Sequence, residues 1–131
     1  MTTEERVEPL NPALAERQRW LIASLRSDVP NERVVDAMAA VRRDLFVPRR
    51  DRDMAYDDRA LSIGSGQTIS QPQIVAVMSA ALDPDPGATV LDVGTGSGYQ
   101  AAILALLARR VVSVERVPAL ADSASDRLQR L

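Results

Sequence analysis

The sequence predicts an α/β fold in which N-terminal helices precede the start of a doubly wound parallel sheet. Residues 89–93 and 111–114 are short apolar runs of the kind found in buried parallel strands. A helical segment, 98–108, separates them, and a glycine-rich turn joins the first strand to that helix. Pro118 opens a last helix. The order strand, helix, strand, helix indicates a βαβ unit.

Three helices are expected upstream of the sheet. The first starts at Asn11, a good N-cap, with Pro12 at the first helical position, where its missing N–H costs nothing. The second starts at residues 30–31 and should end near Arg43; the third covers residues 72–82. The apolar face expected for the third helix comprises Ile74, Val75, Met78, Ala81 and Leu82.

Composition narrows the classes of function. The 131 residues carry a formal net charge of -2, so no clustered positive charge points to a nucleic-acid partner. The chain has no cysteine and no histidine, which removes thiolate catalysis, Cys/His zinc sites and a histidine general base. We therefore expect no metal site and no nucleic-acid partner.

The sequence also lacks a membrane signal. Residues 1–10 are polar and acidic, with no apolar signal-peptide core. The longest apolar run, residues 101–108, is far shorter than the roughly 20 residues that span a bilayer. We expect no membrane partner and a cytoplasmic location.

Three regions are expected along the chain. Residues 1–10 form a flexible tail, residues 11–87 a helical and substrate-loop region, and residues 88–131 the first half of a cofactor-binding domain. The Arg-rich stretch 42–53 also contains three Asp. It is predicted to be a solvated loop with local ion pairs and not a binding patch.

The glycine-rich turn is the strongest local signal for a ligand. Gly94, Gly96 and Gly98 allow positive φ and let a ligand approach the backbone, and the turn opens a helix whose free N–H groups face that ligand. Glu115 follows the second strand, 21 residues after Gly94. A carboxylate at this place accepts hydrogen bonds from ribose hydroxyls.

Other interpretations of the turn stay open at this point. A dinucleotide fingerprint would place its third glycine where Tyr99 stands, which argues against NAD or FAD. The three glycines could also serve only to shape a tight turn, and Glu115 could be an exposed charge at a strand end.

Several segments resemble known methyltransferases. The run DVGTGSGYQAA, residues 92–102, resembles the first cofactor motif of class I S-adenosylmethionine-dependent methyltransferases, which have a Rossmann-like fold. The run IGSGQTISQP, residues 63–72, resembles the substrate loop of protein-L-isoaspartate O-methyltransferases and is the more specific motif. Residues 44–48, 55–56 and 111–116 are also similar to that family.

The resemblance implies an enzyme of protein repair. The family methylates the α-carboxyl group of L-isoaspartyl residues in damaged proteins, with S-adenosyl-L-methionine as cofactor. The implied cofactor-binding residues are Asp92, Gly94, Thr95, Gly96, Gly98 and Glu115. The implied substrate-binding residues are Gln67, Thr68 and Ser70. Ser70 stands at the family's active-site serine and would orient the substrate carboxylate; from residue type alone, it is also a good N-cap for the helix at Pro72.

Three departures from the family pattern qualify the prediction. Ser65 and Arg42 stand where the family commonly has Gln and Pro, and the family continues for several strands and helices beyond the match. We expect an N-terminal part with reduced or no activity alone, which self-associates through unpaired sheet edges. The alternatives are another class I methyltransferase, acting on small molecules or RNA, and a non-catalytic cofactor-binding or regulatory fragment.

Overall fold

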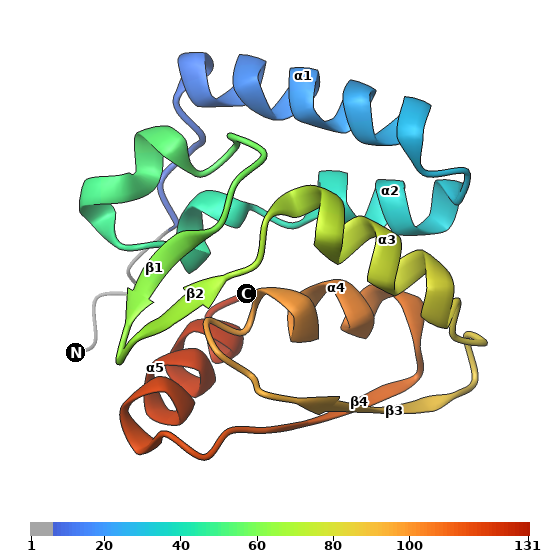
Figure 1. Ribbon diagram of the computed structural model, residues 1–131, viewed down its shortest axis with the longest axis vertical. Coiled ribbons are helices and arrows are strands. Elements are labelled where there is room, and N and C mark those ends of the chain that lie inside the picture. Colours follow the sequence, from blue (N-terminus) through green and yellow to red (C-terminus); the bar gives the residue numbers. More distant parts are fainter. Residues whose placement is uncertain (1–6) are drawn as a thin grey trace.

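A computed structural model describes residues 7–131, and its elements stack in layers over one small parallel sheet (Figure 1). Residues 1–6, most of the expected tail, lie outside the described part. The elements are, in order, α1 (Pro12–Asp28), α2 (Glu32–Ala40), the 3-10 helices η1 (Arg43–Phe46) and η2 (Arg49–Met54), β1 (Leu61–Gly64), β2 (Gln67–Ile69), α3 (Pro72–Leu82), β3 (Thr89–Val93), α4 (Tyr99–Leu107), β4 (Arg110–Val114) and α5 (Pro118–Gln129).

The predicted βαβ unit is present. Strands β3 and β4 pair in parallel, with Val90 opposite Val111, and α4 packs on one face of the pair. Val90 is buried there against Leu104 and Ala108 of the α4 region. Because each strand alternates its side chains between two faces, Val111 joins this cluster while its neighbours point outward.

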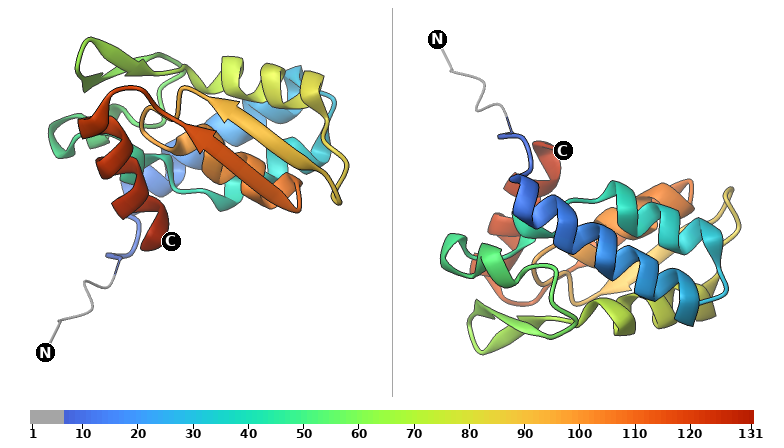
Figure 2. Two further views of the ribbon diagram at one scale, coloured as in Figure 1. Left: turned by 90° about the horizontal axis from the view of Figure 1, so that it is seen from below. Right: turned by 90° about the horizontal axis from the view of Figure 1, so that it is seen from above.

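The other face of the sheet is apolar and uncovered. Figure 2, left, shows β3 and β4 nearest the viewer with no element drawn over them. Leu91 pairs with Val112 and Val93 with Val114, so four apolar side chains form one patch. Their exposed fractions are 64% for Leu91, 75% for Val93, 38% for Val112 and 46% for Val114.

One hydrophobic core joins the N-terminal helices to the βαβ unit. It contains Leu25 of α1, Val35 of α2, Phe46 of η1 and Ile103 of α4, each no more than 2% exposed. Helix α2 packs on α1, α3 and α4, so it lies at the centre of the helical layers. The regions 11–87 and 88–131 therefore share a core.

The predicted starts of the first two helices are confirmed. The side chain of Asn11 accepts a hydrogen bond from the Ala13 N–H at 2.8 Å, and that of Asn31 accepts one from the Val34 N–H at 3.2 Å. The predicted end of the second helix near Arg43 is wrong. Helix α2 ends at Ala40 because Val41 is extended and the Arg43 side chain turns into the core.

The prediction that residues 42–53 form a solvated loop is wrong for its first part. Arg43 is 1% and Asp44 2% exposed. Asp44 accepts hydrogen bonds from the Arg42 guanidinium at 2.6 Å and the Tyr56 hydroxyl at 2.7 Å. Burial works to raise the pKa of Asp44, but the hydrogen bonds from Arg42 and Tyr56 outweigh it and hold that pKa below its usual value.

The predicted apolar face of the third helix is also wrong, although its bounds, Pro72–Leu82, are confirmed. Of the residues expected inside, only Val75 is buried, beside Pro72, Ala76 and Ser79. Met78 is 64% and Leu82 53% exposed. Helix α2 packs against the side of α3 that carries small residues, so the more apolar stripe faces outward.

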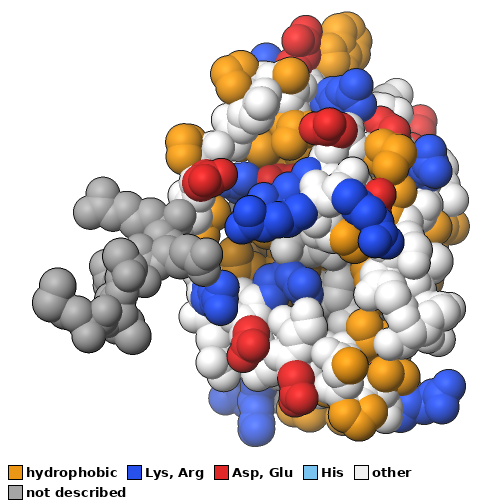
Figure 3. All heavy atoms as spheres, turned by 90° about the vertical axis from the view of Figure 1, so that its left-hand side faces the viewer, with side chains coloured by type: hydrophobic (Ala, Val, Ile, Leu, Met, Phe, Trp, Pro, Cys, Tyr) orange, Lys and Arg blue, Asp and Glu red, His pale blue; other side chains and the backbone are white. Residues whose placement is uncertain are grey.

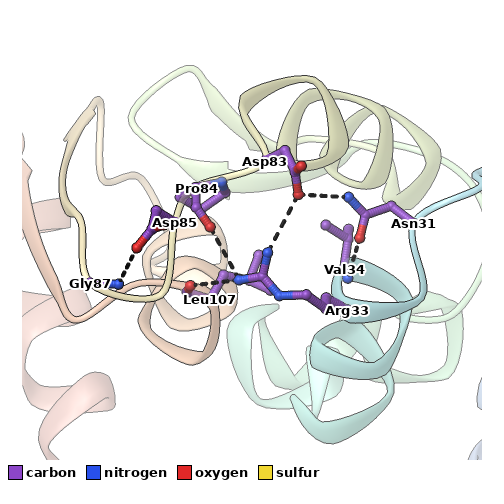
Figure 4. A network of polar contacts seen from close by, with 8 residues as sticks. All are labelled: Asn31, Arg33, Val34, Asp83, Pro84, Asp85, Gly87 and Leu107. Carbon is purple, nitrogen blue, oxygen red and sulfur yellow. Dashed lines mark hydrogen bonds and ion pairs between the residues drawn. The ribbon is translucent and has the colours of Figure 1, made fainter.

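A network around Arg33 holds the far ends of α3 and α4 to α2 (Figure 4). Its guanidinium donates to the carbonyl oxygens of Pro84 at 3.1 Å and Leu107 at 3.0 Å. Asp83 accepts from the Asn31 side chain at 3.0 Å, so the N-cap of α2 belongs to the same network. No helix of residues 7–131 is long and apolar enough to span a bilayer.

Candidate functional site

The glycine-rich turn runs from the end of β3 to the start of α4. Gly94, Gly96 and Gly98 all have positive φ, at +88°, +54° and +90°. The N–H groups of Gly94 and Thr95 both donate to the Val114 carbonyl, which anchors the turn to the end of β4. Apart from Gly94 itself and its two chain neighbours, no heavy atom of residues 7–131 lies within 4 Å of the position that a Cβ on Gly94 would take, so the backbone there is open to a ligand.

Glu115 lies beside this turn, as the sequence predicted. Its Oε1 accepts a hydrogen bond from the Gly96 N–H at 2.9 Å, and its Oε2 accepts one from the Val117 N–H at 3.0 Å. These backbone hydrogen bonds, that from Val117 first, lower the pKa of Glu115. Since a carboxylate has about four lone-pair sites, each oxygen can still accept a further hydrogen bond.

A hydroxyl that sequence reasoning missed connects two predicted residues. Ser113 Oγ donates to Asp92 Oδ2 at 2.7 Å and lies 2.6 Å from Thr95 Oγ1. Ser113 stands opposite Asp92 in the parallel register, and this pairing is the signal that could have revealed it. The network holds the side chains of Asp92 and Thr95 at the carboxyl ends of both strands.

Gly98 has a different environment from Gly94. A Cβ on Gly98 would lie 3.3 Å from Leu128 Cγ and 3.5 Å from the Cβ of Ala124. The glycine therefore lets α5 approach the start of α4. This part of the turn shapes the packing of helices, while the Gly94 part faces open space.

The predicted substrate loop forms a hairpin. Strands β1 and β2 pair antiparallel, with Leu61 opposite Ile69 and Ser62 opposite Thr68. The hairpin lies against the glycine turn (Figure 1). Ile63 Cδ1 is 3.5 Å from the position that a Cβ on Gly96 would take, so two motifs about 30 residues apart in sequence meet in space.

The predicted substrate residues lie on the exposed surface of this hairpin. Gln67 and Thr68 belong to β2, and Ser70 follows it. The N-capping interpretation of Ser70 is wrong, because the N-cap of α3 is Gln71. Asp58, from a distant segment, accepts the hydrogen bond of the Gln73 N–H at 2.9 Å instead. The Ser70 hydroxyl forms no hydrogen bond with any residue in 7–131.

Two surface hollows lie away from the glycine turn. One is on α1 around Ile22, and the other lies between η2 and α5. Basic side chains gather on the face that contains the second hollow (Figure 3). Arg49 and Arg52 line it together with acidic residues, among them Asp126. These hollows lack the predicted site residues, so the candidate site is the open surface of the turn and hairpin.

A model of the protein-L-isoaspartate(D-aspartate) O-methyltransferase family matches residues 16–131. The chain belongs to this family. A protein-L-isoaspartate O-methyltransferase of Methanoculleus marisnigri is 50% identical over 92% of this chain, and one of Maricaulis maris is 54% identical over 88%. The matches cover 55% and 54% of those two proteins. The chain thus spans about half the length of the curated relatives it matches.

The fold of the protein-L-isoaspartate O-methyltransferase family is found here as well. A Plasmodium falciparum chain described as a member, in complex with S-adenosyl-L-homocysteine, matches with a TM-score of 0.76 and 27% identity. The match covers 86% of this chain and 55% of that one. Family members are methyltransferases that depend on S-adenosylmethionine. The predicted fold class, the start of a Rossmann-like methyltransferase fold, is confirmed.

Proposed function

We propose that this chain supplies the cofactor turn and the substrate hairpin of a protein-L-isoaspartate O-methyltransferase. The complete enzyme would transfer a methyl group from S-adenosyl-L-methionine to the α-carboxyl group of L-isoaspartyl residues in damaged proteins. The observation that supports this most directly is the contact of Ile63 with the glycine turn at Gly96. This contact supports the proposal because the hairpin resembles the family's substrate loop and the turn resembles its cofactor motif.

The residues at the turn fit S-adenosyl-L-methionine. The open space over Gly94 admits a ligand to the backbone, as a Cβ at that position would not. Both oxygens of Glu115 lie at the carboxyl end of the sheet, where a carboxylate accepts hydrogen bonds from ribose hydroxyls. We assign cofactor contacts to Asp92, Gly94, Thr95, Gly96, Gly98 and Glu115.

The bound cofactor would supply a methyl group on a positively charged sulfur. The substrate carboxyl has a reference pKa near 4, so it is ionised at neutral pH and needs no general base. The task of the chain is therefore to hold the carboxylate in line, and such orientation can contribute roughly 7–11 kcal/mol. We assign the orienting hydrogen bond to the Ser70 hydroxyl, which is exposed and has no described partner, with Gln67 and Thr68 beside it.

Activity is proposed to need a second polypeptide segment. The relatives are about twice as long as their match to this chain. A segment equivalent to the remainder of those relatives would cover the apolar face of β3 and β4 and close the open side of the glycine turn. We propose that the 131 residues alone have reduced or no activity.

The test measures transfer of radiolabelled methyl from S-adenosylmethionine to an isoaspartyl peptide, with the matched aspartyl peptide as control. The chain is assayed alone and mixed with a segment equivalent to the remainder of the Methanoculleus marisnigri relative. Selective labelling of the isoaspartyl peptide by the mixture supports the proposal.

Two other outcomes contradict it in different ways. Full activity of the chain alone would refute the need for a second segment. Cofactor binding by the mixture without methyl transfer to the isoaspartyl peptide would favour a binding or regulatory module, or a methyltransferase with another substrate. The self-association, the cytoplasmic location and the division at residue 87 stay predictions.

A further inference from the structure

Four side chains stack on one another, and the stack is hydrogen-bonded to the glycine turn at one end and to the segment before the substrate hairpin at the other. They come from η1, from the first residue of α4 and from α5, which converge beside the hairpin (Figure 1). We call them the cation–aromatic column: Arg43, Phe46, Tyr99 and Arg127. Arg43, Phe46 and Tyr99 are no more than 2% exposed, so most of this column is inside the protein.

The column begins at the glycine turn. Arg127 donates a hydrogen bond from Nη1 to the Ser97 carbonyl oxygen at 2.6 Å. The same guanidinium lies over the Phe46 ring, with Cζ 5.8 Å from the ring centroid. Phe46 in turn meets the Tyr99 ring edge to face, at 5.5 Å between centroids and an angle of 65°.

The column ends at the segment that carries the hairpin. The Arg43 guanidinium lies over the Tyr99 ring, with Cζ 5.0 Å from the ring centroid. Its Nε donates to the Ala55 carbonyl at 2.7 Å, and its Nη2 donates to the Arg59 carbonyl at 3.2 Å. Arg59 is two residues before the start of β1.

The segment that Arg43 holds controls both ends of the hairpin. Its residue Asp58 accepts the hydrogen bond of the Gln73 N–H, at the start of the helix that follows the hairpin. The two ends of residues 61–70, which include Ser70, are therefore both attached to this segment. A shift of the Arg43 guanidinium would move the hairpin at both ends.

Arg43 is an unusual choice for a residue that only fills the core. No carboxylate among residues 7–131 lies within 4.0 Å of its guanidinium, and its Nη1 has no hydrogen-bond partner there. Burial lowers the pKa of Arg43 and of Arg127. Burying such cations without carboxylates is costly, and a residue chosen for volume alone would be apolar.

We propose that the column is a positioning device that fixes the substrate hairpin relative to the glycine turn. The inference rests on the proposed function for its purpose, because it sets where the Ser70 hydroxyl lies relative to the cofactor. The column couples its two ends, so that a change at the Arg127 end loosens the hairpin at the Arg43 end. Orientation contributes to catalysis only when such distances are held.

The test is native-state amide hydrogen exchange on the ligand-free chain, in which each exchange rate is normalised to the measured global stability. Arg127→Met removes the contacts with Ser97 and Phe46 and substitutes no residue of the hairpin. We expect the amides of residues 61–69 to exchange roughly tenfold faster, a factor between those for loss of an exposed and of a desolvated cation–π contact, because Arg127 is half-buried. Arg127→Lys should also speed the exchange of these amides, since lysine keeps the charge but lacks the planar group that stacks on Phe46.

Two controls separate coupling from general destabilisation. Arg33→Met removes another arginine that donates to two backbone carbonyls, but at the far end of α4. It should leave the normalised exchange of residues 61–69 unchanged. Tyr99→Phe keeps a ring in the column and should preserve the coupling, whereas Tyr99→Leu should abolish it.

The proposal is overturned if Arg127→Met and Arg127→Lys speed exchange only near their own end of the column, or affect the hairpin no more than Arg33→Met does. This readout needs neither cofactor nor substrate. A coupled hairpin in a chain that methylates no isoaspartyl peptide even when mixed with the second segment would keep the column and refute the proposed function. An uncoupled hairpin in an active enzyme would refute the column and leave the proposed function standing.

Discussion

At the scale of single residues, the candidate site depends on side chains that form hydrogen bonds with residues far away in the sequence. Asp58 caps a helix 15 residues further along the chain, and Ser113 joins Asp92 to Thr95 across two strands. Ser70, the residue with the most obvious sequence context for a cap, is left free of that task. The proposed contact of Ser70 with a substrate carboxylate requires such a free hydroxyl.

The first prediction compares Ser70 with Asp58. We expect Asp58→Ala to lower the free energy of unfolding by about 1 kcal/mol, because the Gln73 N–H loses its partner. Ser70→Ala should change it by less than about 0.5 kcal/mol, as for an exposed residue without partners. Urea unfolding of the chain measures both. In the complemented enzyme, Ser70→Ala should lower methyl transfer; equal losses of stability in the two variants would restore the capping interpretation.

The second prediction concerns pH and Glu115. The folded state holds the pKa of Glu115 below its ordinary value of 4.5, so the carboxylate stabilises the fold above that pH. This contribution is lost as the pH falls below 4.5 and through the folded-state pKa. We therefore expect the wild-type chain to lose more stability than Glu115→Gln between about pH 5 and about pH 3.

The measurement is urea unfolding at several pH values. Asp122→Asn, on the exposed side of α5, controls for the loss of one negative charge. Parallel stability curves for the wild-type chain and Glu115→Gln would show that the hydrogen bonds from Gly96 and Val117 do not persist in solution.

At the scale of elements, the glycine turn has two parts with different surroundings, one at Gly94 and one at Gly98. Gly94 and Gly98 have nearly the same positive φ, +88° and +90°, so an alanine at either place carries backbone strain. Only Gly98 also faces a neighbouring helix, through Leu128 at 3.3 Å. The pair therefore separates strain from packing.

The third prediction uses this pair. We expect Gly94→Ala to cost about 1–2 kcal/mol in the free energy of unfolding, and Gly98→Ala to cost more, because α5 must also move away. Gly94→Ala should weaken S-adenosyl-L-homocysteine binding in the complemented enzyme more than its stability loss explains. Denaturant unfolding and calorimetric titration check the two claims; a larger stability loss for Gly94→Ala would contradict the division of the turn.

The elements that sequence predicted well are those with local causes. The caps at Asn11 and Asn31, the bounds Pro72–Leu82 and the βαβ order follow from residues close in sequence. The buried face of α3 could not be read in this way. Helical periodicity shows which residues share a side of α3, but it does not show which side packs against α2. In the structure, the side with small residues does so.

The same limit applies to Arg43. Composition favoured a solvated loop, and nothing near residue 43 shows that Tyr99, 56 positions later, will lie beneath its guanidinium. The resemblance to the family could be recognised from the residues of the two motifs, whereas the contact between these motifs through Ile63 and Gly96 is a product of the tertiary fold.

At the scale of the whole molecule, the apolar side chains are distributed unevenly. One face of the β3–β4 pair is packed on α4, while the other exposes Leu91, Val93, Val112 and Val114. A two-stranded sheet with an open apolar face and unpaired edges is marginal in water. Contiguous patches of this kind mark surfaces that bind another polypeptide.

The last prediction tests this surface with the double variant Val93→Thr and Val114→Thr. The two side chains are paired in register and exposed, and threonine keeps their shape and strand preference while adding a hydroxyl. We expect stability to change by less than about 1 kcal/mol, self-association in sedimentation equilibrium to weaken, and activity in the mixture with the second segment to fall. Trp20→Gln, at a 72% exposed residue on α1, removes an apolar side chain in the layer furthest from the sheet and is the control. If Trp20→Gln weakens association while the valine variant does not, the contact surface lies on α1, and the sheet face must stay open for another reason.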